Sequence, residues 1–335
     1  MIEIDGSHME GGGQILRTAV GLSVLLGRDC HIHSVRKGRG EPGLRPQHRA
    51  GIMALAELCD AQVEGAEIGS TELDFRPERL DPPKDMSVDV HTAGSVGLIL
   101  QGLLIPLARA PHPVTIELTG GTHVKWAPVV EFLQQVLAWH LGRLGVPVSV
   151  ELLEYGFYPK GQGRIRVEVE PGEVEGLTCA ERGELDTIDV WSVATEDLRG
   201  ARVAERQIEG TGLSFGEVHP AYVQAASTGT SVFMCGRTER TRIGASHLGE
   251  RGVPAERIGG SCADRLRKQL RQDACLDAHM ADQILPYLAM AADKSRVSVA
   301  AITDHCRTNM WVIEKFLPAR FEIDESRRTI TCHPH

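Results

Sequence analysis

Hydrophobic residues along the chain recur in three segments that share one internal order. Each segment has an apolar run with helical spacing, then a short strand-like run, then a second helical run. These runs are, in chain order, 13–27, 30–36 and 48–60; 97–110, 114–118 and 129–145; and 281–291, 296–302 and 310–317. A further strand-like run closes each segment, as AQVEGAEIG, VPVSVELL and ARFEIDE. The pattern predicts a layered α/β fold built from a repeated unit of about 60 residues.

The stretch between the second and third segments has a different character. GFYPKGQGRIRVEVEP, at 156–171, reads as a turn and strand that complete the second segment. Beyond it we expect two strands and two helices, the last of them basic and amphipathic, at 187–194, 201–210, 230–237 and 255–273. The organisation that follows is a main domain built from three repeats, with a smaller inserted α/β domain. Their predicted bounds are 1–182 with 277–335 for the main domain and 183–276 for the insert.

Composition and charge narrow the class of protein. Hydrophobic residues make up 42% and charged residues 24% of the 335 positions, as in an ordinary folded protein, while aromatic residues are scarce at 4%. The net charge of −9 argues against a protein that coats long nucleic-acid duplexes, because neutralisation of phosphates dominates such binding. A local basic site for one phosphorylated end stays compatible with that total.

Cysteine spacing and the absence of long apolar runs suggest a compartment. No two of the eight cysteines have a C-x-x-C spacing, so we do not expect a zinc site. The start, MIEIDGSHMEGGG, lacks the regions of a signal peptide, and no apolar run approaches the roughly 20 residues that span a membrane. We therefore expect a cytoplasmic, reducing location, no membrane contact and free thiols.

EGGGQILR, from Glu10 to Arg17, places three glycines before a helical run. Such a loop lets backbone N–H groups converge on an anion at the positive end of a helix. Helical spacing would align Gln14 and Arg17, with Glu10 at the mouth of the helix. A carboxylate, an amide and a guanidinium could hold a metal ion and phosphate oxygens there. The alternative is a flexible turn before a solvated helix face, since neither a Walker A loop nor a Rossmann fingerprint is present.

The loop RKGRGEPGLRPQHR, at 36–49, is a concentrated basic patch in an acidic protein. The loop has one acidic residue, Glu41. Its basic residues are Arg36, Lys37, Arg39, Arg45 and Arg49. Guanidinium forks suit phosphate and sugar oxygens. An ordinary charged surface loop is the competing interpretation.

Two further segments carry candidate polar groups beside the third repeat. HCRTN lies between a strand and a helix, so we expect His305 on the connecting loop and Thr308 or Asn309 as the helix cap. A lone histidine is more often structural than catalytic. In HMADQ, Asp282 and Gln283 stand at the head of an apolar helix, where a charge is normally a dipole or capping feature.

Together these motifs resemble the RNA 3′-terminal phosphate cyclase family, from the first strand to about Phe321. The matching motifs occur in order as EGGGQ-x-x-R, R-x-G-R-x-x-P-G-L, TAGS with LILQ, GFYP-x-G-x-G, ADQ and H-x-x-TN. The resemblance implies three repeated units, each pairing two helices with a four-stranded sheet, and a smaller inserted domain.

The resemblance also implies an enzyme that uses ATP to convert an RNA 3′-phosphate into a 2′,3′-cyclic phosphate. In that family a histidine attacks the α-phosphate of ATP, giving a histidine–AMP phosphoramidate and pyrophosphate. The AMP then passes to the RNA 3′-phosphate, forming RNA(3′)pp(5′)A. The neighbouring 2′-hydroxyl finally attacks that phosphate and expels AMP. Imidazole suits this nucleophilic catalysis because it is both a competent nucleophile and a good leaving group.

Residue roles follow position by position from the same resemblance. His305 matches the nucleophile, and Glu10 matches the position that holds a divalent metal, Mg²⁺ or Mn²⁺. The positions expected to bind the nucleotide are Gln14, Arg17, Gln101, Pro128, His279, Met280, Ala281, Asp282 and Gln283. Those expected to bind RNA phosphate are Arg36, Arg39 and Gln47. His279 is a departure, because a tyrosine would also suit stacking on adenine. The expected partner is RNA with a 3′-phosphate end, and no protein partner is implied.

Three other interpretations of the sequence compete with a cyclase. A non-catalytic relative that acts in ribosome assembly would keep the scaffold but lack the nucleophile, whereas His305, Glu10 and Asp282 are all present. Enolpyruvyl transferases share the helix–strand organisation but need more chain. A plain RNA-binding module would consume no ATP and would leave the EGGGQ and ADQ segments unexplained.

Overall fold

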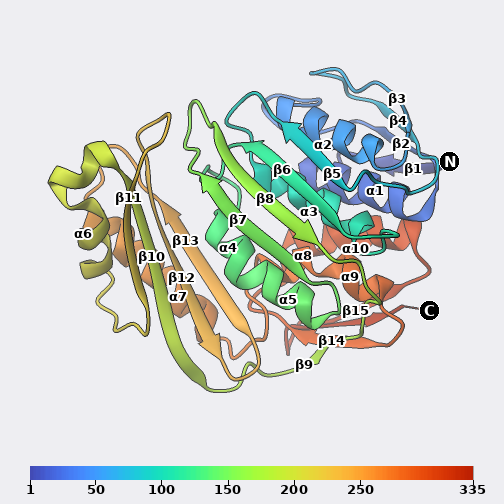
Figure 1. The fold of residues 1–335 in the computed structure, drawn as a ribbon. Helices are drawn as coiled ribbons and strands as arrows, with labels where there is room; N and C mark the ends of the chain where they lie inside the picture. Colours follow the sequence, from blue (N-terminus) through green and yellow to red (C-terminus); the bar gives the residue numbers. More distant parts are fainter. Residues whose placement is uncertain (335) are drawn as a thin grey trace.

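The computed structural model describes residues 1–334 and shows a mixed α/β protein (Figure 1). Within that range the strands form four mixed sheets of four strands each. Three of the sheets belong to repeated units of the chain, and the fourth belongs to the stretch inserted into the third unit. The predicted fold class is therefore confirmed.

Each repeated unit runs strand, helix, strand, helix, strand, strand. The first unit comprises β1 (Ile2–Asp5), α1 (Gly13–Leu26), β2 (Cys30–His33), α2 (Pro46–Glu57), β3 (Gln62–Glu64) and β4 (Leu73–Arg76). The second comprises β5 (Asp85–Asp89), α3 (Val96–Leu107), β6 (Val114–Gly120), a second helix in three parts, α4 (Val130–Phe132), η1 (Leu133–Leu137) and α5 (Ala138–Arg143), then β7 (Val148–Glu154) and β8 (Gly163–Val169). The third comprises β9 (Thr178–Cys179), α8 (Met280–Gln283), α9 (Leu285–Met290), β14 (Ser295–Ser298), α10 (Asp304–Phe316), β15 (Arg320–Asp324) and β16 (Thr329–His333).

The three sheets share one topology. Their strand orders are β1-β2-β4-β3, β5-β6-β8-β7 and β9-β14-β16-β15. In each sheet the first pair is parallel and the other two pairs are antiparallel. The hydrophobic pattern found the helices, the strand between the two helices of each unit and the strand after the second helix. It missed β1, β5 and β9 at one edge of each sheet, and also β4 and β16 inside theirs. Those strands span only two to five residues, too few to show a clear period.

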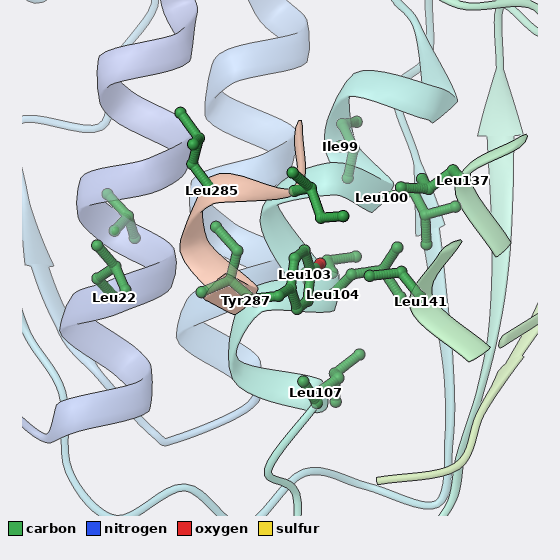
Figure 2. Close-up of a cluster of buried hydrophobic side chains, with 14 of the residues drawn as sticks. Leu22, Ile99, Leu100, Leu103, Leu104, Leu107, Leu137, Leu141, Leu285 and Tyr287 are labelled. Carbon is green, nitrogen blue, oxygen red and sulfur yellow. The ribbon is translucent and has the colours of Figure 1, made fainter. Parts of the chain in front are cut away.

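The main core lies where helices of all three units meet. Figure 2 shows Leu22 of α1, Leu103 of α3, Leu137 beside α5 and Leu285 of α9 gathered in one cluster. Helix α3 is buried on nearly every side, which explains its almost wholly apolar sequence. Within residues 1–334, however, no helix is both long and apolar enough to cross a membrane.

The inserted stretch forms its own sheet and a second, smaller core. Its elements are β10 (Leu185–Thr195), η2 (Glu196–Ala201), α6 (Val203–Glu209), β11 (Val218–Val223), β12 (Thr230–Thr238), β13 (Arg242–Leu248) and α7 (Ala255–Leu270), with strand order β11-β10-β12-β13. Helix α7 packs Ile258, Cys262 and Leu266 onto one face of this sheet. The other face contacts α4, where the Phe132 and Phe233 rings meet edge to face. Strands β11 and β13 were not predicted from the sequence.

The chain enters the insert and returns from it beside the same strand of the main domain, β14. A disulfide joins the two crossing points. Cys179 of β9 pairs with Val297 of β14, and after the insert Leu276 bridges Val299, the residue that directly follows β14. Cys179 is bonded to Cys275, although 96 positions separate them. The expectation that all thiols are free is therefore wrong for this pair, because folding brings together cysteines that no local spacing relates.

Candidate active site

His305 lies in the first turn of α10. The hydroxyl of Thr303 caps this helix by accepting a hydrogen bond from the backbone N–H of Cys306, at 3.2 Å. The predicted loop position of His305 and the predicted cap at Thr308 or Asn309 are therefore both wrong. The sequence signal for the true start was present in Thr303, since Ser, Thr, Asp and Asn are the preferred N-caps. The imidazole thus stands at the positive end of a thirteen-residue helix.

Gln14 joins His305 to Asp282 through its side-chain amide. Gln14 Nε2 donates a hydrogen bond to Asp282 Oδ2 at 3.1 Å. Its Oε1 atom therefore faces His305 and accepts a hydrogen bond from Nδ1 of the ring. Because a carbonyl oxygen can only accept, Nδ1 carries the proton and the lone pair of the neutral ring is on Nε2.

Buried polar side chains lock α1, α8 and α10 together beneath this chain of contacts. Asn309 Nδ2 donates to the backbone oxygen of Asp282 at 2.7 Å. The hydroxyl of Thr18 in turn donates to Asn309 Oδ1 at 2.6 Å. Three segments from the first and third units, far apart in sequence, are therefore held in one register around His305. Asn309 acts inside this network rather than as a helix cap.

Charges around His305 favour its neutral form. Burial lowers the pKa of His305 below its usual value, and the positive charges of Arg17 and Arg39 lower it further. Burial also lowers the pKa of Arg17 to about 10, so this guanidinium stays charged at neutral pH. Burial raises the pKa of Asp282 to about 6, although His279, Arg17 and Gln14 oppose the rise. At neutral pH the site therefore holds a neutral imidazole between a carboxylate and two guanidinium groups.

Glu10 lies on the glycine loop beside the same imidazole. Its Oε2 atom is 3.7 Å from His305 Nδ1, and its Oε1 atom forms an ion pair with Arg39. Arg39 Nη2 also donates to the backbone oxygen of Glu10 at 3.0 Å. A Cβ added at Gly12 would clash with Glu10 Oε2 and lie 3.0 Å from that same Nη2 atom, so a larger residue there would displace the ends of both side chains.

The donor set fits a magnesium ion that is held chiefly by water and phosphate. No group of three or more His, Cys, Asp or Glu side chains suited to a metal occurs in residues 1–334. Glu10 Oε2 is buried and has no hydrogen-bond partner in that part of the chain. Mg²⁺ usually keeps several waters and binds one or two carboxylates together with substrate phosphates. One orphaned carboxylate oxygen therefore fits the predicted role of Glu10.

The residues expected to bind RNA phosphate are close to the glycine loop, but they are engaged differently. Arg36 Nη1 donates to the backbone oxygens of Glu41 and Gly43, both at 2.8 Å, and so braces its own loop. Gln47, near the start of α2, accepts a hydrogen bond from the backbone N–H of Ser95 at 3.1 Å. Among the three, Arg39 faces the Glu10 side of the site most directly.

The nucleotide candidates offer unpartnered polar groups and ring surfaces. Gln101 Nε2 and Gln283 Oε1 are buried without a hydrogen-bond partner among the described residues. A ligand that carries both donors and acceptors would satisfy them. The His279 ring meets Phe132 edge to face, with 6.4 Å between centroids. Pro128 is partly exposed in the loop between β6 and α4, but no hydrogen bond links it or Gln101 to His305 within residues 1–334.

Two residues that the sequence reasoning missed support the site from behind. Asp277 is fully buried and accepts hydrogen bonds from the backbone N–H groups of His279, Met280 and Gly244, the last on β13 of the insert. An aspartate just before a short helix was the available signal. The His48 ring packs against Gly13 at the start of α1, and burial lowers its pKa to about 3. His48 has no comparable sequence signal.

Comparison with known proteins shows the family of this chain. The family described as RTC, RNA 3′-terminal phosphate cyclase, matches residues 8–323. The chain is 41% identical to the RNA 3′-terminal phosphate cyclase of Thermococcus gammatolerans, over 96% of this chain and 94% of the relative. Identity to the protein of that name from Methanopyrus kandleri is also 41%, over 96% of this chain and 95% of the relative. The chain belongs to the RNA 3′-terminal phosphate cyclase family.

Similarity to a solved structure is much weaker. The enolpyruvyl transferase NikO from Streptomyces tendae aligns with 50% of this chain and 32% of its own, at 15% identity and a TM-score of 0.28. A likeness of that size supports no argument about fold or function.

Proposed function

We propose that this protein is an ATP-dependent RNA 3′-phosphate cyclase in which His305 carries AMP. The observation that carries the proposal is the hydrogen bond between His305 Nδ1 and Gln14 Oε1. That bond directs the proton to Nδ1 and leaves Nε2 of a neutral imidazole as the nucleophile. Family membership and the two relatives named above support the cyclase activity, whereas the role of His305 rests on the geometry of the site.

In the first step His305 Nε2 attacks the α-phosphorus of ATP. A nitrogen–phosphorus bond forms while the bond to the bridging oxygen breaks, and pyrophosphate leaves. Arg17 and the amino-terminal ends of α1 and α10 offset the negative charge that gathers on the phosphates. A divalent metal, when bound, would supply further charge neutralisation, and Glu10 is the residue placed to hold it.

The next two steps involve the RNA end. An oxygen of the RNA 3′-phosphate attacks the AMP phosphorus, the nitrogen–phosphorus bond breaks, and the ring returns to its starting form. The neighbouring 2′-hydroxyl then loses its proton to solvent as its oxygen attacks the 3′-phosphorus, which closes the five-membered cyclic phosphate and expels AMP. In this proposal Arg39 and Gln47, which lie beside the glycine loop, would hold the 3′-phosphate during both transfers.

Self-labelling tests the nucleophile directly. The purified protein is incubated with MgCl₂ and ATP labelled in the α-phosphate, without RNA. We expect label on the wild type that acid releases and base does not, as a phosphoramidate requires. His305→Ala should take up no label. His219→Ala, an exposed histidine of β11, is the matched control and should label like wild type.

RNA then tests the remaining steps. An oligonucleotide with a 3′-phosphate should discharge the labelled protein and acquire a cyclic end, whereas the same RNA with a 3′-hydroxyl should not. Absence of label with either Mg²⁺ or Mn²⁺ would overturn the proposal. It would then favour a non-catalytic member of the family.

A further inference from the structure

Aromatic side chains are scarce in this chain, yet two of them are held out in solvent. Trp126 is 94% exposed and Tyr158 is 76% exposed, and every other strongly exposed large hydrophobic residue in the described chain is aliphatic. The side chain of His91, a third planar ring, is 82% exposed. Rings of this size contribute most to stability when they are buried. Their exposure here therefore calls for a partner.

All three rings stand on loops at one edge of the second sheet. Strands β5 and β6 are parallel, with Asp89 opposite Thr119, so both end at this edge. Strand β8 begins there, with Gly163 opposite Gly120, and β7 ends beside it. Figure 1 shows β5, β6 and β7 pointing the same way. The loops 90–95, 121–129 and 155–162 that follow these strands therefore meet in one place.

Backbone contacts fasten the three loops together. Gly121 N–H donates to Gly94 oxygen at 2.8 Å, and His123 N–H donates to Gly156 oxygen at 3.1 Å. The loops at 90–95 and 155–162 touch so closely that a Cβ on Gly161 would lie 2.8 Å from the Cα of Ala93. We call His91, Trp126 and Tyr158 the aromatic rim. The three loops that carry the aromatic rim are packed against one another.

The backbone conformation at the rim is costly. Trp126 has φ of 63°, in the left-handed region that bulky side chains avoid, whereas His91, with φ of 56°, is of a residue type that enters this region more readily. Strained conformations of this kind cluster at binding and catalytic sites, which is why the conformation of Trp126 points to a role in binding. The Trp126 ring is almost wholly in solvent, so packing within this chain does not offset the cost.

The rim adjoins the candidate site for the RNA 3′-phosphate. Ser95, which ends the His91 loop, donates its backbone N–H to Gln47. Lys125 and Lys160, both exposed, flank the other two rings. Lys125 pairs with Glu250 of the insert at 3.1 Å, and the backbone N–H of Lys160 donates to Ser227 of the insert. The rim therefore spans the surface from the phosphate-binding candidates to the inserted domain.

We propose that the aromatic rim stacks the bases of single-stranded RNA that lie immediately upstream of the 3′-phosphate. The inference rests on the proposed function for the position of the RNA end. Aromatic side chains provide stacking platforms that tolerate any base, because every base has a π-face. Flanking lysines suit the phosphates between stacked bases. The rim thus adds affinity for longer RNA ends of any sequence.

The test compares RNA length and ring identity in binding assays without ATP. Wild type should bind a single-stranded twelve-nucleotide RNA 3′-phosphate more tightly than a dinucleotide 3′-phosphate. Trp126→Ala and Tyr158→Ala should each weaken binding of the longer RNA by roughly tenfold and leave the dinucleotide unchanged. Trp126→Phe should bind the longer RNA with wild-type affinity. It should lack the decrease in tryptophan fluorescence that stacking of a base on Trp126 causes in the wild type. Val218→Ala, an exposed residue of the insert, is the matched control.

Label uptake from ATP without RNA separates this inference from the proposed function. The ring variants should label His305 like wild type, since neither Trp126 nor Tyr158 is itself a residue assigned to that step. If the wild-type protein takes up no label, the proposed function is wrong. The binding comparison still measures whether the aromatic rim contacts RNA. Equal affinity of wild type and Trp126→Ala for the longer RNA would overturn the inference. Weaker labelling of His305 in Trp126→Ala would instead indicate that the Trp126 ring contacts the adenine of ATP. A changed sedimentation coefficient of Trp126→Ala, with unchanged affinity for RNA, would indicate that the ring contacts another protein molecule.

Discussion

Gln14 accepts a hydrogen bond from His305 Nδ1 across 291 positions of sequence. The same amide donates to Asp282, so one side chain fixes both the tautomer and the orientation of the imidazole. This contact links the first unit of the main domain to the third. It makes Gln14 a positioning residue for the proposed nucleophile, a role that differs from the direct nucleotide contact inferred from the family pattern.

Replacing Gln14 should slow the labelling of His305 without unfolding the protein. Gln14→Ala removes the acceptor that holds Nδ1–H, so the ring samples unproductive orientations and tautomers. We expect the labelling rate to fall by roughly 10- to 100-fold, as when a group that orients a reactive ring is lost. Gln134→Ala, which removes a hydrogen bond to Val150 oxygen remote from the site, should label normally. Normal labelling by Gln14→Ala would contradict the positioning role.

The pH dependence of labelling should have an acidic limb. Attack requires neutral His305, whose pKa is lowered, and the arrangement of Gln14 is supported by ionised Asp282, whose pKa is raised to about 6. The rate should therefore be maintained above about pH 6.5 and fall as the pH decreases through 6, where Asp282 gains a proton. In Asp282→Asn the contribution of Asp282 should be lost, and the remaining limb should follow His305 alone. Initial rates of label uptake between pH 5 and 9 measure this, and a wild-type rate that rises on acidification would refute it.

Acid should destabilise the fold through His140. This histidine is buried, with Nδ1 bonded to Val136 oxygen, and burial lowers its pKa to about 4. The unfolded chain takes up the proton near pH 6.5, before the folded state does, so stability is lost as the pH falls from 6.5 toward 4. His140 by itself should account for about 2 kcal/mol of the loss between pH 7.5 and 5. Urea unfolding of wild type and His140→Gln at both pH values measures it. His112→Gln, at an exposed histidine, should keep the wild-type dependence.

Reduction of the Cys179–Cys275 disulfide should lower stability. The bond closes a loop with a sequence separation of 96 and ties both ends of the insert to the third sheet. Its removal should cost about 2–4 kcal/mol. Thermal unfolding with and without dithiothreitol should show a lower midpoint on reduction for wild type only. The Cys179→Ser, Cys275→Ser double variant should be unaffected by the reductant. Titration of eight thiols in the unfolded, unreduced protein would contradict the bond, because six cysteines are free in the structure.

The local sequence was sufficient to predict the helices, the repeated units and the family. The apolar runs predicted α1, α3 and the body of α10, and the order of helices and strands predicted three similar units, which the shared sheet topology confirms. These features depend on periodicity over a few turns, which the chain displays directly. Short strands such as β9 and the exposed β11 escaped prediction because two residues, or a strand with few buried positions, carry little periodic signal.

The sequence by itself determined which residues carry polar chemistry, whereas the tertiary structure decided how they meet. Glu10, Asp282 and His305 each stand in a recognisable motif, but nothing local states that Gln14 joins two of them or that Arg39 pairs with the third. The disulfide and the shared edge that gathers Trp126 and Tyr158 were equally invisible. The physical reason is that these contacts join segments tens to hundreds of residues apart. Only the packing of the three units and the insert sets those distances.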